Sequence, residues 1–258
     1  MGNCKSKGTS ATPRKLGASV NSSVLVTNYD DEITIPFEQD PVAVMRRGII
    51  GGSQLIRTPF GYRKIVYADY TASGRYLEII ETFLLNNVYP FYANTHTESS
   101  ATGAITTQLR EEARQIISKS LNAPQDKYTV LFVGTGCTGA IEKIMKVLGI
   151  CLPESVLERW SLSSLIPEEE RPVVFVGPFE HHSNELPWRD SIATVVVIPE
   201  DQDGCPDMVV LEKKLNHYKG RKFKIGSFCA GSNVTGICID TQRYAKLLHE
   251  VRTNRMSL

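Results

Sequence analysis

The chain has 258 residues, with 29 Lys and Arg against 28 Asp and Glu, and its formal net charge is +1. This balance lacks the basic excess that nucleic-acid binding requires, so we expect no nucleic-acid partner. No run approaches the roughly 18 apolar residues of a membrane-spanning helix. The six cysteines form no C-x-x-C pair, which favours a reducing cytoplasm over a disulfide framework.

The amino-terminal residues, MGNCKS, match the M-G-x-x-x-[ST] pattern for myristoylation of Gly2. Cys4 is placed for a palmitoyl group, and no acidic residue occurs before Asp30. A second signal matters because one myristoyl chain binds membranes only marginally. We expect residues 1–27 to be a disordered tail, lipidated at Gly2 and Cys4, that tethers a cytoplasmic protein to a membrane surface. The alternative is a disordered polar tail that merely begins with Met-Gly.

Hydrophobic spacing predicts a helical region followed by strands that alternate with helices. Helical spacing is found in Tyr76–Val88, Ile105–Leu121, Met208–His217 and Thr241–Val251. Short apolar runs that suit strands buried on both faces are Tyr128–Val133, Val173–Val176, Ala193–Ile198 and Phe223–Phe228. This order predicts an α/β fold with a doubly wound, mostly parallel sheet and flanking helices.

A glycine-rich turn, Gly134–Gly139, lies between a predicted strand and a predicted helix. Glycines allow a tight turn, and the free N–H groups at a helix start attract phosphate. The spacing is also that of a dinucleotide fingerprint, which needs an acidic residue at the end of the next strand. Glu154 and Glu158 lie near the required distance, but their segment has no strand character. A turn that binds nothing is the third interpretation.

Two further loops follow predicted strands, where doubly wound sheets bind their ligands. The first contains His181, which could stack on a planar ring, act as an acid or base, or serve as a structural loop histidine. Its neighbour His182 cannot readily share a metal with it and no third ligand is evident, so no metal site is expected. The second loop contains Asn233, whose amide could donate to a ligand oxygen or close an Asx turn.

Together these loops resemble the class V aminotransferase and cysteine desulfurase family of fold-type I pyridoxal-phosphate enzymes. Three family patterns, Y-x-D-x-x-A, E-H-H-x-N-x-x-P-W and S-N-x-x-G, are similar to Tyr67–Ser73, Glu180–Trp188 and Ser232–Gly236. The resemblance runs from about residue 65 to about residue 250. It implies pyridoxal 5'-phosphate as the cofactor, an amino acid as the substrate and a homodimer as the assembly.

The resemblance also implies roles for individual residues. Cys137 and Thr138 lie in the phosphate-binding turn, with Thr138 at the phosphate-binding threonine. His181 takes the position that stacks on the pyridine ring, and Asn233 the position that contacts the ring hydroxyl. Two residues depart from the pattern, since Cys137 stands where the family often has threonine and Gly139 where it often has an acidic residue.

The family pattern continues beyond the last predicted helix into an aspartate that faces the ring nitrogen and then a lysine that holds the cofactor as a Schiff base. Residues 251–258 resemble neither. We therefore expect the N-terminal part of such an enzyme, with a helical segment at 28–127, a partial cofactor-binding domain at 128–250 and a divergent tail at 251–258.

This part alone is expected to bind the cofactor weakly or not at all and to have little or no turnover. Desulfuration, transamination and other eliminations all stay open as the parent reaction. The alternatives are a non-catalytic, membrane-tethered binding module on the same scaffold and a nucleotide-binding domain.

Overall fold

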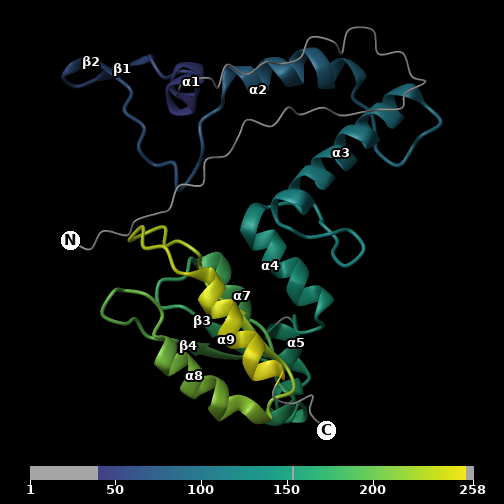
Figure 1. Cartoon of the computed structure of the whole chain (residues 1–258), viewed down its shortest axis with the longest axis vertical. Coiled ribbons are helices and arrows are strands. Elements are labelled where there is room, and N and C mark those ends of the chain that lie inside the picture. The colour runs from purple at the N-terminus through teal and green to yellow at the C-terminus, as the bar shows by residue number, and fades with distance from the viewer. Residues whose placement is uncertain (1–39, 153, 254–258) are drawn as a thin grey trace. The chain divides into compact units, whose positions relative to one another are not determined.

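The computed structural model describes residues 40–152 and 154–253 (Figure 1). The chain divides into two compact units, Met1–Tyr128 and Thr129–Leu258. The predicted tail at 1–27, with its lipidation sites Gly2 and Cys4, lies outside the described residues.

The described part of the first unit combines short elements with one long helix. Its elements are α1 (Pro41–Gly48), the antiparallel hairpin of β1 (Leu55–Thr58) and β2 (Gly61–Lys64), α2 (Glu78–Phe83), the π-helical turn η1 (Leu84–Val88), the 3-10 turn η2 (Tyr89–Phe91) and α3 (Ala101–Ser120). No large apolar side chain is buried within residues 40–128. The buried apolar core of the described chain therefore belongs to the second unit.

Both helices predicted for the first unit are confirmed, with different boundaries. The predicted Tyr76–Val88 helix is α2 continued by the π-helical turn. Helix α3 begins before the predicted Ile105 because Ser100 caps it, its hydroxyl oxygen accepting the N–H of Gly103 at 3.2 Å.

The second unit contains a parallel sheet with the strand order β4–β3–β5. The strands β3 (Val173–Val176), β4 (Thr194–Val197) and β5 (Lys224–Ser227) lie within three of the predicted runs. The fourth strand prediction, Tyr128–Val133, is wrong because the structure forms no strand there. An apolar run indicates burial but does not supply the neighbouring strand that a ladder needs, and Leu131 in this run is 57% exposed.

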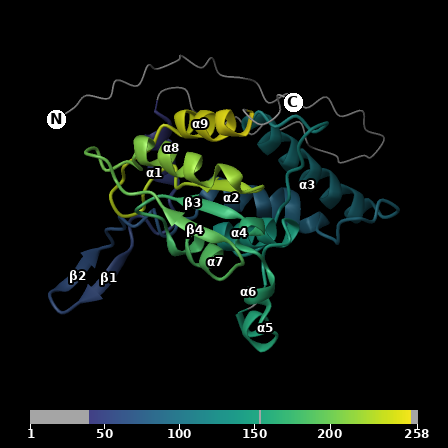
Figure 2. The same ribbon diagram turned by 90° about the horizontal axis from the view of Figure 1, so that it is seen from below.

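Helices cover both faces of this sheet (Figure 2). The helical elements of the second unit are α4 (Gly136–Val147), α5 (Glu154–Arg159), α6 (Leu162–Leu165), η3 (Glu168–Glu170), η4 (His182–Asn184), α7 (Leu186–Arg189), α8 (Met208–His217), η5 (Tyr218–Gly220) and α9 (Thr241–Thr253). In Figure 2, α8 and α9 lie on one side of β3 and β4, while α4 and α7 lie on the other. This is the predicted doubly wound α/β arrangement.

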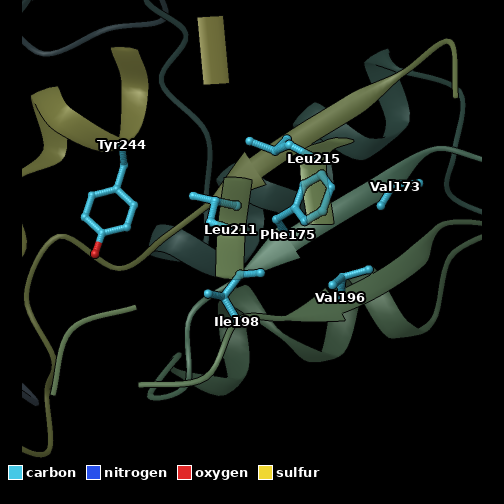
Figure 3. Packing of buried hydrophobic residues seen from close by; sticks show 7 residues of the cluster. All are labelled: Val173, Phe175, Val196, Ile198, Leu211, Leu215 and Tyr244. Carbon is cyan, nitrogen blue, oxygen red and sulfur yellow. The ribbon is translucent and has the colours of Figure 1, made fainter. Parts of the chain in front are cut away.

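Strand β3 is buried on both faces because its side chains enter two clusters alternately. Val173 and Phe175 join the first cluster, in which they pack with Val196, Ile198, Leu211, Leu215 and Tyr244 (Figure 3). Val174 and Val176 join the second cluster, in which they pack with Ile141, Met145, Ile150 and Trp188. Both helical layers therefore hold the central strand in place.

At the amino ends of the strands, a buried arginine joins the segments that precede β3 and β5. Arg221 is 7% exposed. Its guanidinium donates to the Arg171 carbonyl at 3.0 Å and pairs with the Glu168 carboxylate at 2.6 Å. This contact stabilises the edge of the sheet opposite to the one where ligands bind in such folds.

Tyr244 makes the stability of the second unit sensitive to alkaline pH. Its hydroxyl donates to the Pro206 carbonyl inside the first cluster. Burial, and then the negative charges of Cys205 and Asp201, raise the pKa of Tyr244 from 10.0 to about 12. Below the lower value the phenol is protonated in both states. Between the two values only the unfolded chain ionises, so the free energy of unfolding falls as pH rises.

At alkaline pH, we expect the fall in the free energy of unfolding to be about 2 kcal/mol smaller for Tyr244→Phe than for the unmodified chain, because phenylalanine cannot ionise in either state. Urea unfolding of both chains at about pH 9 and about pH 11.5 measures the difference. Other groups that titrate in this range are common to both chains and cancel. An equal loss in both chains would show that Tyr244 is not protected from ionisation.

Candidate functional site

Helix α4 begins without a side-chain cap. Thr135 precedes it in the left-handed conformation with φ 59°, and Gly136 also has a positive φ of 62°. The Thr135 hydroxyl donates to the Gly134 carbonyl at 2.8 Å instead of accepting from the helix. The N–H groups of Gly136, Cys137 and Thr138 lie in the first turn, where a helix has no internal acceptors. An anion is the natural partner for such donors.

The predicted phosphate residues are accessible at this helix start. Cys137 and Thr138 are exposed. A Cβ added at Gly134 or Gly136 would meet nothing within 4 Å, so space above the turn is open to a ligand. A Cβ at Gly139 would instead lie 1.9 Å from the Gly134 carbonyl oxygen. The turn folds back onto the helix at Gly139, which explains why a side chain is absent there.

His181 projects from the loop that follows β3. It precedes the 3-10 turn η4, and its ring is exposed. The backbone N–H of Ser183 donates to His181 Nδ1 at 3.1 Å. This bond uses the Nδ1 lone pair, so the neutral ring carries its proton on Nε2. The imidazole is therefore both exposed and oriented, as a ring that stacks on a ligand must be.

The loop after β5 presents Asn233 on an exposed turn. Ser232 closes this turn, because its hydroxyl oxygen accepts the N–H groups of Val234 at 3.2 Å and Thr235 at 3.1 Å. The Asx-turn interpretation of Asn233 is therefore wrong, since the neighbouring serine has that role. The Asn233 amide is left at the surface, where a ligand oxygen can reach it.

Two residues of the Glu180–Trp188 stretch that the sequence interpretation left without a role, Glu180 and Asn184, hold the loops together. The Glu180 carboxylate accepts the N–H of Cys229, just beyond β5, at 2.9 Å. Asn184 donates to the Ser227 carbonyl in β5 at 3.1 Å. In the sequence, only the placement of Glu180 and Asn184 on either side of the two histidines could have indicated this role. Their partners, Ser227 and Cys229, lie more than 40 residues away in the chain.

The structure brings the loops after β3 and β5 together at one edge of the sheet. Helix α4 contacts η4, and Glu180 joins the loop after β3 to the loop after β5. The four predicted side chains make no hydrogen bond to one another in the described part of the chain. A small cavity of about 20 Å³ lies between the loops and is lined by residues that include Glu180, Cys229 and Ser232. It has room for a single water only and is therefore too small to hold a cofactor.

Two other kinds of site find no support within residues 40–152 and 154–253. No group of three His, Cys, Asp or Glu side chains there could hold a metal ion. None of the described helices has the length and apolarity to span a membrane. The dinucleotide interpretation also fails locally, because the segment with Glu158 is the helix α5 and not a strand end.

Residues 66–255 match the family model of the class V aminotransferases. The chain belongs to this family. It is 29% identical over 192 residues to the cysteine desulfurase CsdA of Escherichia coli K12, a match that covers 71% of this chain and 42% of that protein. It is 27% identical over 191 residues to a probable cysteine desulfurase of Halalkalibacterium halodurans, covering 72% of this chain and 41% of that protein.

A solved structure has the same fold. The apo cysteine desulfurase from Thermococcus onnurineus NA1 superposes with a TM-score of 0.59 at 19% identity, over 82% of this chain and 45% of that one. The chain thus spans less than half the length of the class V relatives that it matches. The predicted family and fold are confirmed, and the cofactor contacts of Cys137, Thr138, His181 and Asn233 stay predictions.

We expect Gly139→Ala to disturb the turn, because its methyl group would overlap the Gly134 carbonyl. Overpacking of this kind costs about 1–3 kcal/mol, and a lower melting temperature is the measurement. The matched control is Gly134→Ala, for which the added methyl meets nothing within 4 Å. Equal melting temperatures for the two variants would contradict the close approach at Gly139.

Proposed function

We propose that this chain provides the pyridoxal 5'-phosphate-binding surface of a class V enzyme that acts on an amino acid. The observation that carries the proposal is that α4, whose start has no side-chain cap, contacts the 3-10 turn η4 that directly follows His181. A helix start without a cap suits a dianion, and an exposed, oriented imidazole ring suits a planar heterocycle. The named relatives are cysteine desulfurases, which makes cysteine the favoured substrate.

Each exposed residue that the resemblance assigned carries a group that suits one part of the cofactor. The first-turn N–H groups and the Thr138 hydroxyl would hold the phosphate, with the helix dipole favouring its negative charge. The His181 imidazole would cover one face of the pyridine ring, and the Asn233 amide would donate to the ring hydroxyl. When bound, the cofactor supplies an electron sink for the bonds at the α-carbon of an amino acid.

We expect the 258-residue chain to bind pyridoxal phosphate and Thr138→Val to weaken that binding about tenfold, the effect of losing one charge-assisted hydrogen bond. Absorbance and fluorescence titration of the purified chain measures the affinity. Thr241→Val is the matched control, because Thr241 is an exposed threonine that begins α9. No saturable binding by the unmodified chain would refute the proposed function.

In this chain the bound cofactor is expected to be noncovalent, with little or no turnover. Lys143 and Lys146 lie on α4 beyond the first turn that would hold the phosphate. A reacting amine that is not positioned loses the proximity advantage, which is worth several kcal/mol of barrier. Borohydride treatment followed by peptide mapping checks this part. A stoichiometric adduct on one lysine would contradict it and make these residues sufficient for chemistry.

A second proposal concerns the amino-terminal residues, which lie outside the described structure. We propose that Gly2 is myristoylated and Cys4 palmitoylated, supported by the MGNCKS match and the lysines around it. Two acyl chains give stable membrane attachment, whereas one does not. With little turnover on the same scaffold, the chain would then be a membrane-tethered binding module.

Metabolic labelling in cells with a myristate analogue tests this tether. We expect label on the unmodified chain and none on Gly2→Ala, because the acyl chain is attached to that glycine. Cys4→Ala is the companion variant, which should still carry the label but should no longer be recovered in the membrane fraction. Equal labelling of the unmodified chain and Gly2→Ala, or labelling of neither, would rule the modification out.

A further inference from the structure

The Glu180 carboxylate bridges the ends of two neighbouring strands. Its Oε1 accepts the N–H of Gly177, directly after β3, at 2.9 Å, and the N–H of Cys229, beyond β5, also at 2.9 Å. Its Oε2 accepts the side-chain amide of Asn184 at 2.7 Å. Hydrogen bonds to an ionised acceptor are about twice as strong as neutral ones, so this carboxylate strongly joins the two loops.

Asn184 uses its whole amide group in the same network. Its Nδ2 donates to Glu180 and, at 3.1 Å, to the Ser227 carbonyl. Its Oδ1 accepts the indole N–H of Trp188 at 3.1 Å and the Ser227 hydroxyl at 2.5 Å. All four bonds fix which way the amide faces. Trp188 is 2% exposed in the second cluster, so the network is anchored in the core.

The residues between these two anchors form a short hook, His181–Ser183. Both ends of the hook are held by the network, and the N–H of Asn184 also donates to the His181 carbonyl at 2.8 Å. Ser183 orients the ring through Nδ1. We propose that Glu180 and Asn184 are positioning residues, which set the place of the His181 ring and through it the affinity for the cofactor. This inference rests on the proposed function.

The physical reason is preorganisation. A ring that is already held in its stacking position loses little freedom when a ligand arrives, whereas a mobile loop must be ordered during binding. Neither Glu180 nor Asn184 is predicted to touch the cofactor. Replacing either side chain should therefore weaken cofactor binding only while His181 is present. That dependence distinguishes a positioning role from a general loss of stability.

The experiment uses the 258-residue chain and Asn184→Ala, first without cofactor. Amide hydrogen exchange over residues 178–186 should become about tenfold faster, since the hook loses its anchor. The matched control is Arg221→Lys, which weakens the buried contact at the opposite edge of the same sheet. It should lower the melting temperature without faster exchange in this segment. Unchanged exchange in Asn184→Ala, or an equal increase in the control, would overturn the proposal.

The second arm is a double-mutant cycle on pyridoxal phosphate affinity. Asn184→Ala should weaken binding about tenfold in the unmodified background and by less than about twofold when His181→Ala is already present. Equal, additive losses in both backgrounds would overturn the positioning role. If the unmodified chain binds no cofactor, the proposed function fails by itself, and the exchange arm still decides whether Asn184 holds the hook.

Discussion

The burial of all four β3 side chains, two in each helical layer, is the constraint on which the carboxyl edge of the sheet depends. A strand enclosed on both faces cannot slide or rotate without opening two clusters at once. Its last residue, Val176, is therefore a fixed point. The Glu180 and Asn184 network then connects this fixed point to His181 and to the neighbouring strand β5. The buried core thereby limits the motion of the exposed His181 loop through this series of hydrogen bonds.

Three of the longer helices begin with a side-chain cap, whereas α4 and the short helices α2, α6 and α7 begin without one. Asp40 and Asp207 cap α1 and α8 through their carboxylates, and Ser100 caps α3 through its hydroxyl. Helix α4 has instead a left-handed Thr135 whose hydroxyl bonds to the preceding carbonyl. A missing cap costs about 1 kcal/mol. The first-turn N–H groups of α4 are thereby left available to an anion.

Much of the second unit could be predicted from the sequence because its elements bury apolar runs. Val173–Val176 and Met208–His217 have the boundaries that periodicity predicts, since each is defined by contacts with the core. Tyr128–Val133 has an equally apolar sequence but forms no strand, because strand formation depends on a partner that spacing does not reveal.

The site was predictable to a similar extent and for a similar reason. Loop position after each strand pointed to His181 and Asn233, because parallel strands end at a common edge. The role of Ser232 in closing the turn, and the roles of Glu180 and Asn184, depend on bonds to particular backbone groups. A backbone donor or acceptor has no signature in the sequence, so such partners are found only when the fold is known.

The absence of buried large apolar side chains from residues 40–128 bears on how the protein is made. Domains usually fold in the order in which the ribosome releases them, amino-terminal part first. Residues 40–128 gain little from apolar collapse, and the enclosed strand β3 that could nucleate folding is translated after them. The first cluster, which buries Val173 and Phe175, can form only once β3, β4 and α8 have been made.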